Sequence, residues 1–161
     1  MPTRAPRTAA PKPGAELSLV DALAELSFLV QGQLLRRAGE HELSLIQTRL
    51  LGVLRDRRPT MNELARLLEL DKSSVSGLVD RAERRGLVRR MPSTTDRRAV
   101  LVALTASGAT VAAAVGAQFA SDVSVLLGSW SDSDRAALSG LAARVVSEHA
   151  RERGVNLFAT D

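Results

Sequence analysis

The chain has 161 residues and a formal net charge of +4, and 45% of its residues are apolar although only 2% are aromatic. Ala, Leu and Val must therefore build the core, and an Ala-rich apolar content favours helices over an all-β fold. The chain has no Cys, which excludes disulfides, thiolate nucleophiles and Cys-ligated zinc.

Residues 1–15 are predicted to form a disordered basic arm, because prolines alternate with basic residues and nothing there can bury an apolar face. Contact of this arm with a DNA minor groove is the alternative. The segment lacks the apolar core of a signal peptide, and no apolar run in the chain reaches the roughly 18–20 residues of a membrane span. We therefore expect a cytoplasmic protein with no membrane partner.

Residues 16–43 contain the first predicted helix, since apolar residues recur there at three- and four-residue steps up to Ala38. Gly39 is expected to follow its last turn. The stripe consists of Leu19, Leu23, Leu26, Val30 and Leu34. Ser44 is the expected N-cap of a second helix, which Pro59 stops.

Two short helices are predicted next, and their spacing is typical of a helix-turn-helix. Thr60, with Glu63 three residues later, has the spacing of a capping box, and Asp71 caps the following helix, which Gly86 closes. Glu69 and Leu70 form the turn, where a Gly is often found. Such a crossing projects the second, recognition helix into a DNA major groove.

The exposed side of this recognition helix provides the expected DNA contacts, from short hydroxyl donors and acceptors and from arginines. The residues are Lys72, Ser73, Ser74, Ser76, Gly77, Arg81 and Arg84. Gly77 is costly inside a helix, which fits a close approach of the backbone to DNA.

Residues 87–91 and 99–104 are strand candidates joined by a polar, basic loop, which predicts a β-hairpin wing. Arg97 and Arg98 at its tip are expected to reach the minor groove, whose negative potential attracts Arg, while Asp96 orients an Arg side chain. The surrounding run of basic residues covers the recognition helix and the hairpin. Its arginines are Arg81, Arg84, Arg85, Arg89, Arg90, Arg97 and Arg98.

Two helices complete the chain, one from Thr105 to about residue 128 and one from Ser131 to about residue 153. The fold class is therefore mainly α with a small β-hairpin (α+β). A winged helix-turn-helix domain occupies residues 44–104, helical dimerisation regions occupy 16–43 and 105–153, and a tail covers 154–161. The flanking helices carry more apolar face than one small domain can bury, so we expect a partner chain to cover it.

The segments 71–88 and 96–108 resemble the MarR (multiple antibiotic resistance regulator) family. The most specific features are the Asp-x-Arg pattern of Asp96 and Arg98 and the Leu-Thr-x-x-Gly pattern of Leu104, Thr105 and Gly108. The resemblance spans about residues 16–153. It implies a homodimeric transcriptional regulator, usually a repressor, that binds a pseudo-palindrome in double-stranded DNA.

The resemblance also implies release of DNA when a small molecule enters a cleft between the dimerisation helices and the winged domain. Candidate lining residues are Phe28, Gln31, His41, Gln47 and Trp130. The shortage of aromatic residues argues against a stacking pocket, and the absence of Cys excludes a peroxide-sensing mechanism.

Three other classes of function are weighed against this interpretation. An enzyme is not expected, since neither His41 nor His149 lies near a Ser or carboxylate in a catalytic pattern and no catalytic residue or cofactor is indicated. A metal-responsive regulator of the same fold would use Glu40, His41 and Glu42 with residues near His149, although we expect no metal there. A sequence-independent architectural DNA-binding protein is the third alternative, and it would show no preferred DNA site.

Overall fold

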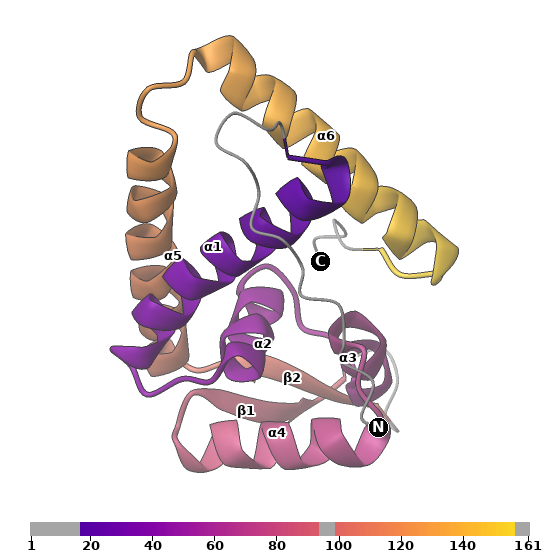
Figure 1. The fold of residues 1–161 in the computed structure, drawn as a ribbon. Coiled ribbons are helices and arrows are strands. Elements are labelled where there is room, and N and C mark those ends of the chain that lie inside the picture. Colours follow the sequence, from indigo (N-terminus) through magenta and orange to yellow (C-terminus); the bar gives the residue numbers. More distant parts are fainter. Residues whose placement is uncertain (1–16, 94–98, 157–161) are drawn as a thin grey trace, which may run out of the picture.

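The computed structural model describes residues 17–93 and 99–156. Six helices and one hairpin form a helical region and a winged helix-turn-helix lobe, which confirms the predicted fold class (Figure 1). The elements are α1 (Leu19–Gly39), α2 (Leu45–Arg55), α3 (Met61–Leu68), α4 (Lys72–Arg84), β1 (Val88–Pro92), β2 (Val100–Leu104), α5 (Ala106–Leu126) and α6 (Asp132–Glu152). The expected basic arm of residues 1–15 and most of the tail lie outside the described residues.

Five predicted helix starts are confirmed. In each, the side chain of the N-cap residue accepts a hydrogen bond from the backbone N–H three residues later, which satisfies one orphan donor of the first turn. These N-caps are Ser44, Thr60, Asp71, Thr105 and Ser131.

The first helix begins later than expected, at Leu19, because Ser18 is its N-cap. Gly39 is its last residue rather than the residue after it, and the positive φ of the following turn falls on Glu42 at 54°. The sequence pattern therefore located this helix correctly but not its two ends.

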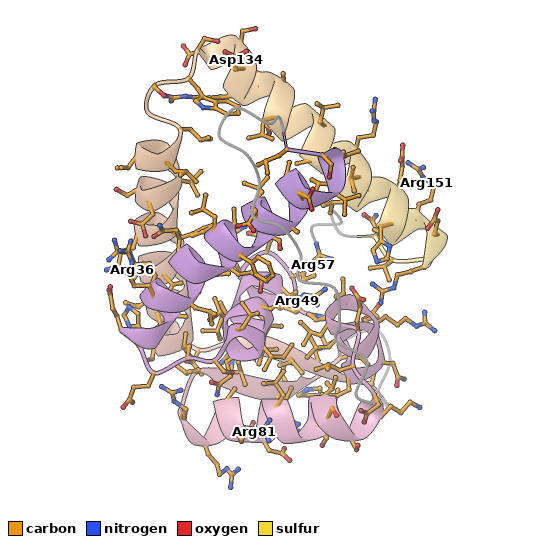
Figure 2. All side chains as sticks on the ribbon, viewed as in Figure 1. Arg36, Arg49, Arg57, Arg81, Asp134 and Arg151 are labelled. Carbon is orange, nitrogen blue, oxygen red and sulfur yellow. The ribbon has the colours of Figure 1, made fainter. Side chains whose placement is uncertain are left out.

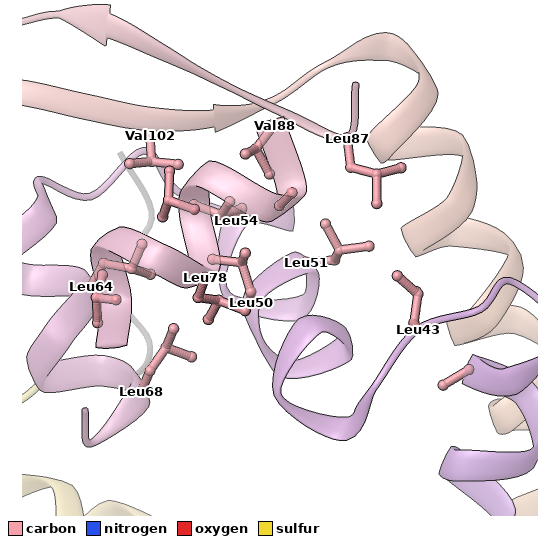
Figure 3. Close-up of a cluster of buried hydrophobic side chains, with 14 of the residues drawn as sticks. Leu43, Leu50, Leu51, Leu54, Leu64, Leu68, Leu78, Leu87, Val88 and Val102 are labelled. Carbon is pink, nitrogen blue, oxygen red and sulfur yellow. The ribbon is translucent and has the colours of Figure 1, made fainter. Parts of the chain in front are cut away.

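A single apolar cluster holds the lobe together (Figure 3). Leucines of α2, α3 and α4 meet the hairpin there, and Leu50, Leu64, Leu68 and Leu78 are at most 1% exposed. Burying one such side chain contributes about 1.5–3 kcal/mol. This packing fixes the direction of α4 relative to α2 and α3.

The hairpin is antiparallel, and its register runs from Val88 opposite Leu104 to Pro92 opposite Val100. Val102 is fully buried, and its backbone N–H donates to the carbonyl of Pro59 at 2.9 Å. Leu87 was expected in the first strand. Its N–H instead donates to the carbonyl of Ala82, which closes α4.

The lobe joins α5 at a tight contact beside Leu87. Thr105 N–H donates to the carbonyl of Leu87 at 3.0 Å, and Thr105 Oγ1 donates to the carbonyl of Gly86 at 2.6 Å. A β-carbon at Gly108 would lie 1.8 Å from that Leu87 oxygen. Only glycine fits at this position, which gives a physical reason for the Leu-Thr-x-x-Gly pattern.

Helices α1 and α5 pack together, and Asp122 on α5 links them through ion pairs with Arg37 at 2.7 Å and Arg36 at 3.3 Å. Asp122 on α5 accepts two hydrogen bonds of 2.7 Å from the guanidinium of Arg37 on α1. Because these hydrogen bonds favour the carboxylate, they lower the pKa of Asp122 to about 2. Such bidentate pairing fixes geometry as well as charge.

Much apolar surface remains exposed on the three long helices. Val20 and Val125 are more than 70% exposed, whereas the lobe buries most of its large apolar residues. The exposed apolar residues are Leu19, Val20, Leu23, Leu26, Phe28, Leu29 and Leu35 on α1, Val125 and Leu126 on α5, and Leu141, Val145 and Val146 on α6.

One expectation about apolar segments is wrong. By length and composition, α5 is apolar enough to cross a membrane, and it is the one such helix among the described residues. A single helix of this kind is weak support for a membrane span. Here α5 packs on α1, α2 and β2, and its Asp122 is paired with Arg37.

Candidate nucleic-acid interface

Helix α4 has one buried face and one exposed, basic face. The buried face is Val75, Leu78, Val79 and Ala82. Lys72, Ser73, Ser74, Arg81 and Arg84 are exposed or half-buried on the opposite face, while Ser76 and Gly77 are half-buried beside them. The lobe places α4 at the end of the molecule farthest from the α5–α6 corner (Figure 1). The structure therefore brings together all the predicted contact residues of the recognition helix.

The first turn of α4 is organised by Asp71. Its carboxylate accepts hydrogen bonds from the Ser74 N–H at 2.9 Å and from the hydroxyls of Ser73 and Ser74 at 2.6 Å each. These donors, the Ser73 hydroxyl foremost, hold the pKa of Asp71 well below its usual range. With their protons directed at Asp71, both hydroxyls keep oxygen lone pairs as acceptors on the exposed surface.

Gly77 stands one turn before Arg81 on the same helix. A β-carbon at Gly77 would lie 3.3 Å from Nη1 of Arg81, which is closer than ordinary van der Waals contact. The absence of a side chain at Gly77 therefore leaves room for the Arg81 guanidinium against the helix. This packing gives a reason for the glycine that needs no contact with DNA.

Two arginines of the basic run are engaged within the lobe. Arg85 donates to the carbonyls of Glu42 at 2.8 Å and His41 at 2.9 Å. Arg90 on β1 forms ion pairs with Asp80 at 2.6 Å and Glu83 at 2.5 Å. Both arginines therefore hold elements together. Fewer arginines of the basic run than the sequence suggested remain as candidates for contact with DNA.

The predicted tip of the wing lies outside the described residues. Asp96, Arg97 and Arg98 fall in the segment 94–98, between the described ends of the hairpin. The hairpin itself is fixed to α4, because Arg90 bridges β1 and two carboxylates of α4. The base of the wing therefore keeps a defined direction from the recognition helix.

A hollow of about 670 Å³ lies between α1, α2 and α5, where the small-molecule cleft was expected. Of the five predicted lining residues, only Gln31 lines it. Leu34, Val115 and Phe119 supply apolar walls, and Arg49 supplies a cation. The sequence offered no signal for Arg49 or Phe119, since their place depends on how α2 and α5 pack.

The other four predicted lining residues are dispersed. Phe28 is 69% exposed on α1, and Trp130 lines a separate hollow at the α5–α6 corner. His41 lies in the turn between α1 and α2, and the Gln47 side chain accepts from the backbone N–H of Ser44 in the capping box. The structure does not bring these four side chains into one cleft.

The metal-responsive alternative finds no cluster in the part of the chain that the structure describes. Within residues 17–93 and 99–156, no three His, Asp or Glu side chains gather as a metal site requires. Glu40, His41 and Glu42 belong to the end of α1 and the turn after it, where Arg37 binds Glu40 at 2.9 Å.

Comparison with solved structures places this architecture among known folds. The structure of NadR in complex with 4-hydroxyphenylacetate superposes with a TM-score of 0.68 at 20% identity, over 84% of this chain and 97% of that chain. A mutant of MepR from Staphylococcus aureus, bound to an oligodeoxyribonucleotide, gives 0.59 at 20% identity, over 83% and 99%. At such identities these similarities show the shared fold.

Sequence comparison points in the same direction. The chain is 39% identical over 75 residues to the HTH-type transcriptional repressor NicR of Pseudomonas putida, which is 46% of this chain and 48% of the relative. The match thus spans about half the length of that protein. Residues 41–99, which run from the turn before α2 into the hairpin, match the MarR family profile. The segment 41–99 is therefore similar to the MarR family, and the chain shares the fold of the solved structures.

Proposed function

We propose that this protein is a transcriptional regulator, a repressor, that binds a specific site in double-stranded DNA as a homodimer. The observation that carries the proposal is the exposed face of α4, where Lys72, Arg81 and Arg84 surround serine hydroxyls on a helix whose other face is locked into the core. A helix of this kind fits a major groove about 12 Å wide.

Similarity to two proteins supports this function. The 39% identical relative is a transcriptional repressor by name, and MepR, which has the same fold, has been solved bound to an oligodeoxyribonucleotide. Members of a family of regulators are not expected to be enzymes, and the interface holds no catalytic arrangement among its described residues. Cytoplasmic location follows from binding to chromosomal DNA.

The homodimer is proposed from the exposed apolar residues of α1, α5 and α6. Soluble monomers rarely expose contiguous apolar patches larger than a few hundred Å², and a second copy related by two-fold symmetry would cover these helices on both chains. Two recognition helices related in this way would read half-sites about 10 base pairs apart.

The hollow between α1, α2 and α5 is the proposed effector site. It lies between the long helices and the lobe, it has apolar walls, and Gln31, Thr48 and Arg49 supply polar groups. A pocket with a few polar groups on apolar walls is typical of small-molecule sites. NadR, which has the same fold, has been solved with 4-hydroxyphenylacetate.

Selection of binding sites from random double-stranded DNA tests the proposal. The expected result is a pseudo-palindrome whose half-sites lie about 10 base pairs apart, bound far more tightly than random DNA at physiological salt. Enrichment of no sequence, with affinity that depends only on salt, would instead identify a sequence-independent architectural protein.

A further inference from the structure

The turn between α3 and α4 contains an unusual residue. Glu69 is the C-cap of α3 and has φ 59° and ψ 43°, the left-handed region. A residue with a β-carbon is disfavoured in this conformation, and glycine adopts it freely. A glutamate at this position therefore needs a reason in its side chain.

The carboxylate of Glu69 joins two arginines from different elements. Arg49 of α2 reaches Glu69 Oε1 at 3.2 Å, and Arg153, the C-cap of α6, reaches the same oxygen at 2.7 Å. The hydrogen bond from Arg49 and the charges of both arginines lower the pKa of Glu69. The turn is thus ionically tied to both neighbouring helices.

The same arginines also bind the end of α3 directly. Arg49 donates to the carbonyls of Leu67 at 3.1 Å and Leu68 at 3.2 Å, and Arg153 donates to the carbonyl of Arg66 at 3.0 Å. The last carbonyls of a helix have no partner within the helix. Two guanidinium groups therefore satisfy the end of α3 while holding the carboxylate of the turn.

Helix α6 meets the lobe at this place. Ala150, one turn before Arg153, is the buried residue of α6, and just beyond the helix Arg57 donates to the carbonyl of Asn156 at 2.9 Å. At the other end of α6, Arg135 reaches back to Gly128 at 3.4 Å. Between its two ends α6 stands clear of the lobe in Figure 1.

We infer that Glu69 is a positioning residue for DNA reading, because its carboxylate fixes the α3–α4 turn against α2 and against the end of α6. Asp71, which caps α4, follows two residues later, so the place of this turn sets the start of the recognition helix. This inference rests on the proposed DNA binding. It adds that the placement of α4 depends on a residue, Glu69, that need not touch DNA.

The direction in which DNA affinity changes when the Glu69 carboxylate is removed tests the inference. A carboxylate close to a DNA-binding face repels phosphate, so its removal alone would strengthen binding. Loss of a positioning residue has the opposite effect, since α4 would enter the groove less well aligned. Because no phosphate contact is lost, the dependence of affinity on salt would stay unchanged.

The test compares E69Q, E69G, R153Q and the double variant E69Q/R153Q with the unaltered protein on the selected DNA site. The single variants are expected to bind about five- to tenfold more weakly, with the double variant no weaker than either, because residues of one network are not additive. E69G is included because it removes the backbone cost of the turn and the carboxylate together, and it is expected to show the same loss.

R151Q is the matched control. Arg151 is an exposed residue of α6 two positions before Arg153 (Figure 2). Its replacement by Gln removes one positive charge, as R153Q does. We expect R151Q to bind within about twofold of the unaltered protein, as surface charges contribute little. Thermal unfolding of each variant shows whether the fold is kept.

Two results would overturn the inference: tighter or equal binding by E69Q, or equal affinities of R153Q and R151Q. Amide hydrogen exchange in the DNA-free protein tests the placement of the turn even if the proposed DNA binding fails. Even where no preferred DNA site exists, R153Q is expected to speed exchange at residues 69–75 relative to R151Q. Equal exchange in both variants would also overturn the inference.

Discussion

Asp80 and Arg81 are adjacent on α4 and face different partners. Asp80 belongs to the ion pair with Arg90 on the hairpin, so its charge is already balanced within the lobe. Arg81 lies on the open face of the helix, and Gly77 leaves space beside its guanidinium. In the proposed function, the positive charge that α4 would present to DNA therefore comes from Arg81, Arg84 and Lys72 rather than from every arginine of the run.

Replacement of Arg81 by Gln tests this assignment. We expect affinity for the selected DNA site to fall at least about fivefold, because one phosphate contact is lost. The slope of log K against log salt, which is negative, should become less steep by about one. Titration by fluorescence anisotropy at several salt concentrations measures both. R151Q provides the control for net charge, and an unchanged slope in R81Q would show that Arg81 does not bind phosphate.

At the scale of elements, the junction of the lobe with α5 depends on Gly108. Alanine there would bring a β-carbon into the Leu87 carbonyl, which belongs to the backbone and cannot move without breaking the hydrogen bond from Thr105.

Gly108→Ala is expected to lower the free energy of unfolding by at least about 2 kcal/mol, as overpacking against a fixed backbone does. Gly116→Ala is the matched control on the same helix, where a β-carbon meets nothing within 4 Å, and it is expected to gain about 0.5–1 kcal/mol. Denaturant unfolding compares the two. Equal stability of the variants would contradict the close contact at Gly108.

The ion pair between α1 and α5 predicts a dependence of stability on pH. Arg37 lowers the pKa of Asp122 to about 2 in the folded protein, below the value of about 3.9 for an unfolded aspartate. The carboxylate thus stabilises the fold above the unfolded pKa, and this stabilisation is lost as the pH falls through about 2.

Asp122→Asn is therefore expected to destabilise the protein at pH 7, and the difference from the unaltered chain should shrink between about pH 4 and pH 2. Thermal unfolding followed by circular dichroism at each pH measures it. A difference that stays constant over this range would mean that the pair does not stabilise the folded state through charge.

The elements that sequence reasoning located well are those with local chemistry. Each confirmed N-cap bonds to an amide three residues away, and the apolar steps that define the helices span a few residues. Contacts between distant parts of the chain have no such signature. Arg37 meets Asp122 across 85 positions, and Arg153 meets the Arg66 carbonyl across 87.

The candidate site divides in the same way. The exposed face of α4 follows from helical periodicity, and the structure brings those residues together as expected. The hollow between α1, α2 and α5 depends on tertiary packing, so only Gln31 of its predicted lining was found. Arg85 and Arg90 read as DNA-facing charge in the sequence because nothing local indicates their partners within the lobe.

At the scale of the whole molecule, exposed apolar side chains gather on the three long helices, whereas α4 has an exposed basic face. This separation suits a protein that binds its own copy with one part and DNA with the other. The 57% exposure of Leu23, within the predicted apolar stripe of α1, makes it a direct probe of the first part.

Leu23→Glu is expected to convert the protein from dimer to monomer without unfolding it, because the side chain is exposed in the single chain and buried only against a partner. Light scattering after size exclusion measures the mass, and circular dichroism checks the helix content. Lys72→Glu on α4 should leave the dimer intact. A monomeric unaltered protein, or a dimeric Leu23→Glu variant, would contradict the proposed interface.

The glycine junction between the lobe and α5 also has a mechanical consequence. Leu87, which lies between the end of α4 and β1, cannot shift relative to the first turn of α5 without opening the contact at Gly108. Helix α5 has 21 residues and is therefore about 30 Å long. If it tilts by about 5° about its end at the α5–α6 corner, its first turn beside the lobe moves by about 3 Å. A small tilt of α5 thus produces a larger displacement of the attached lobe. In the proposed dimer, the distance between the two DNA-binding lobes would therefore depend on the angle between the two α5 helices.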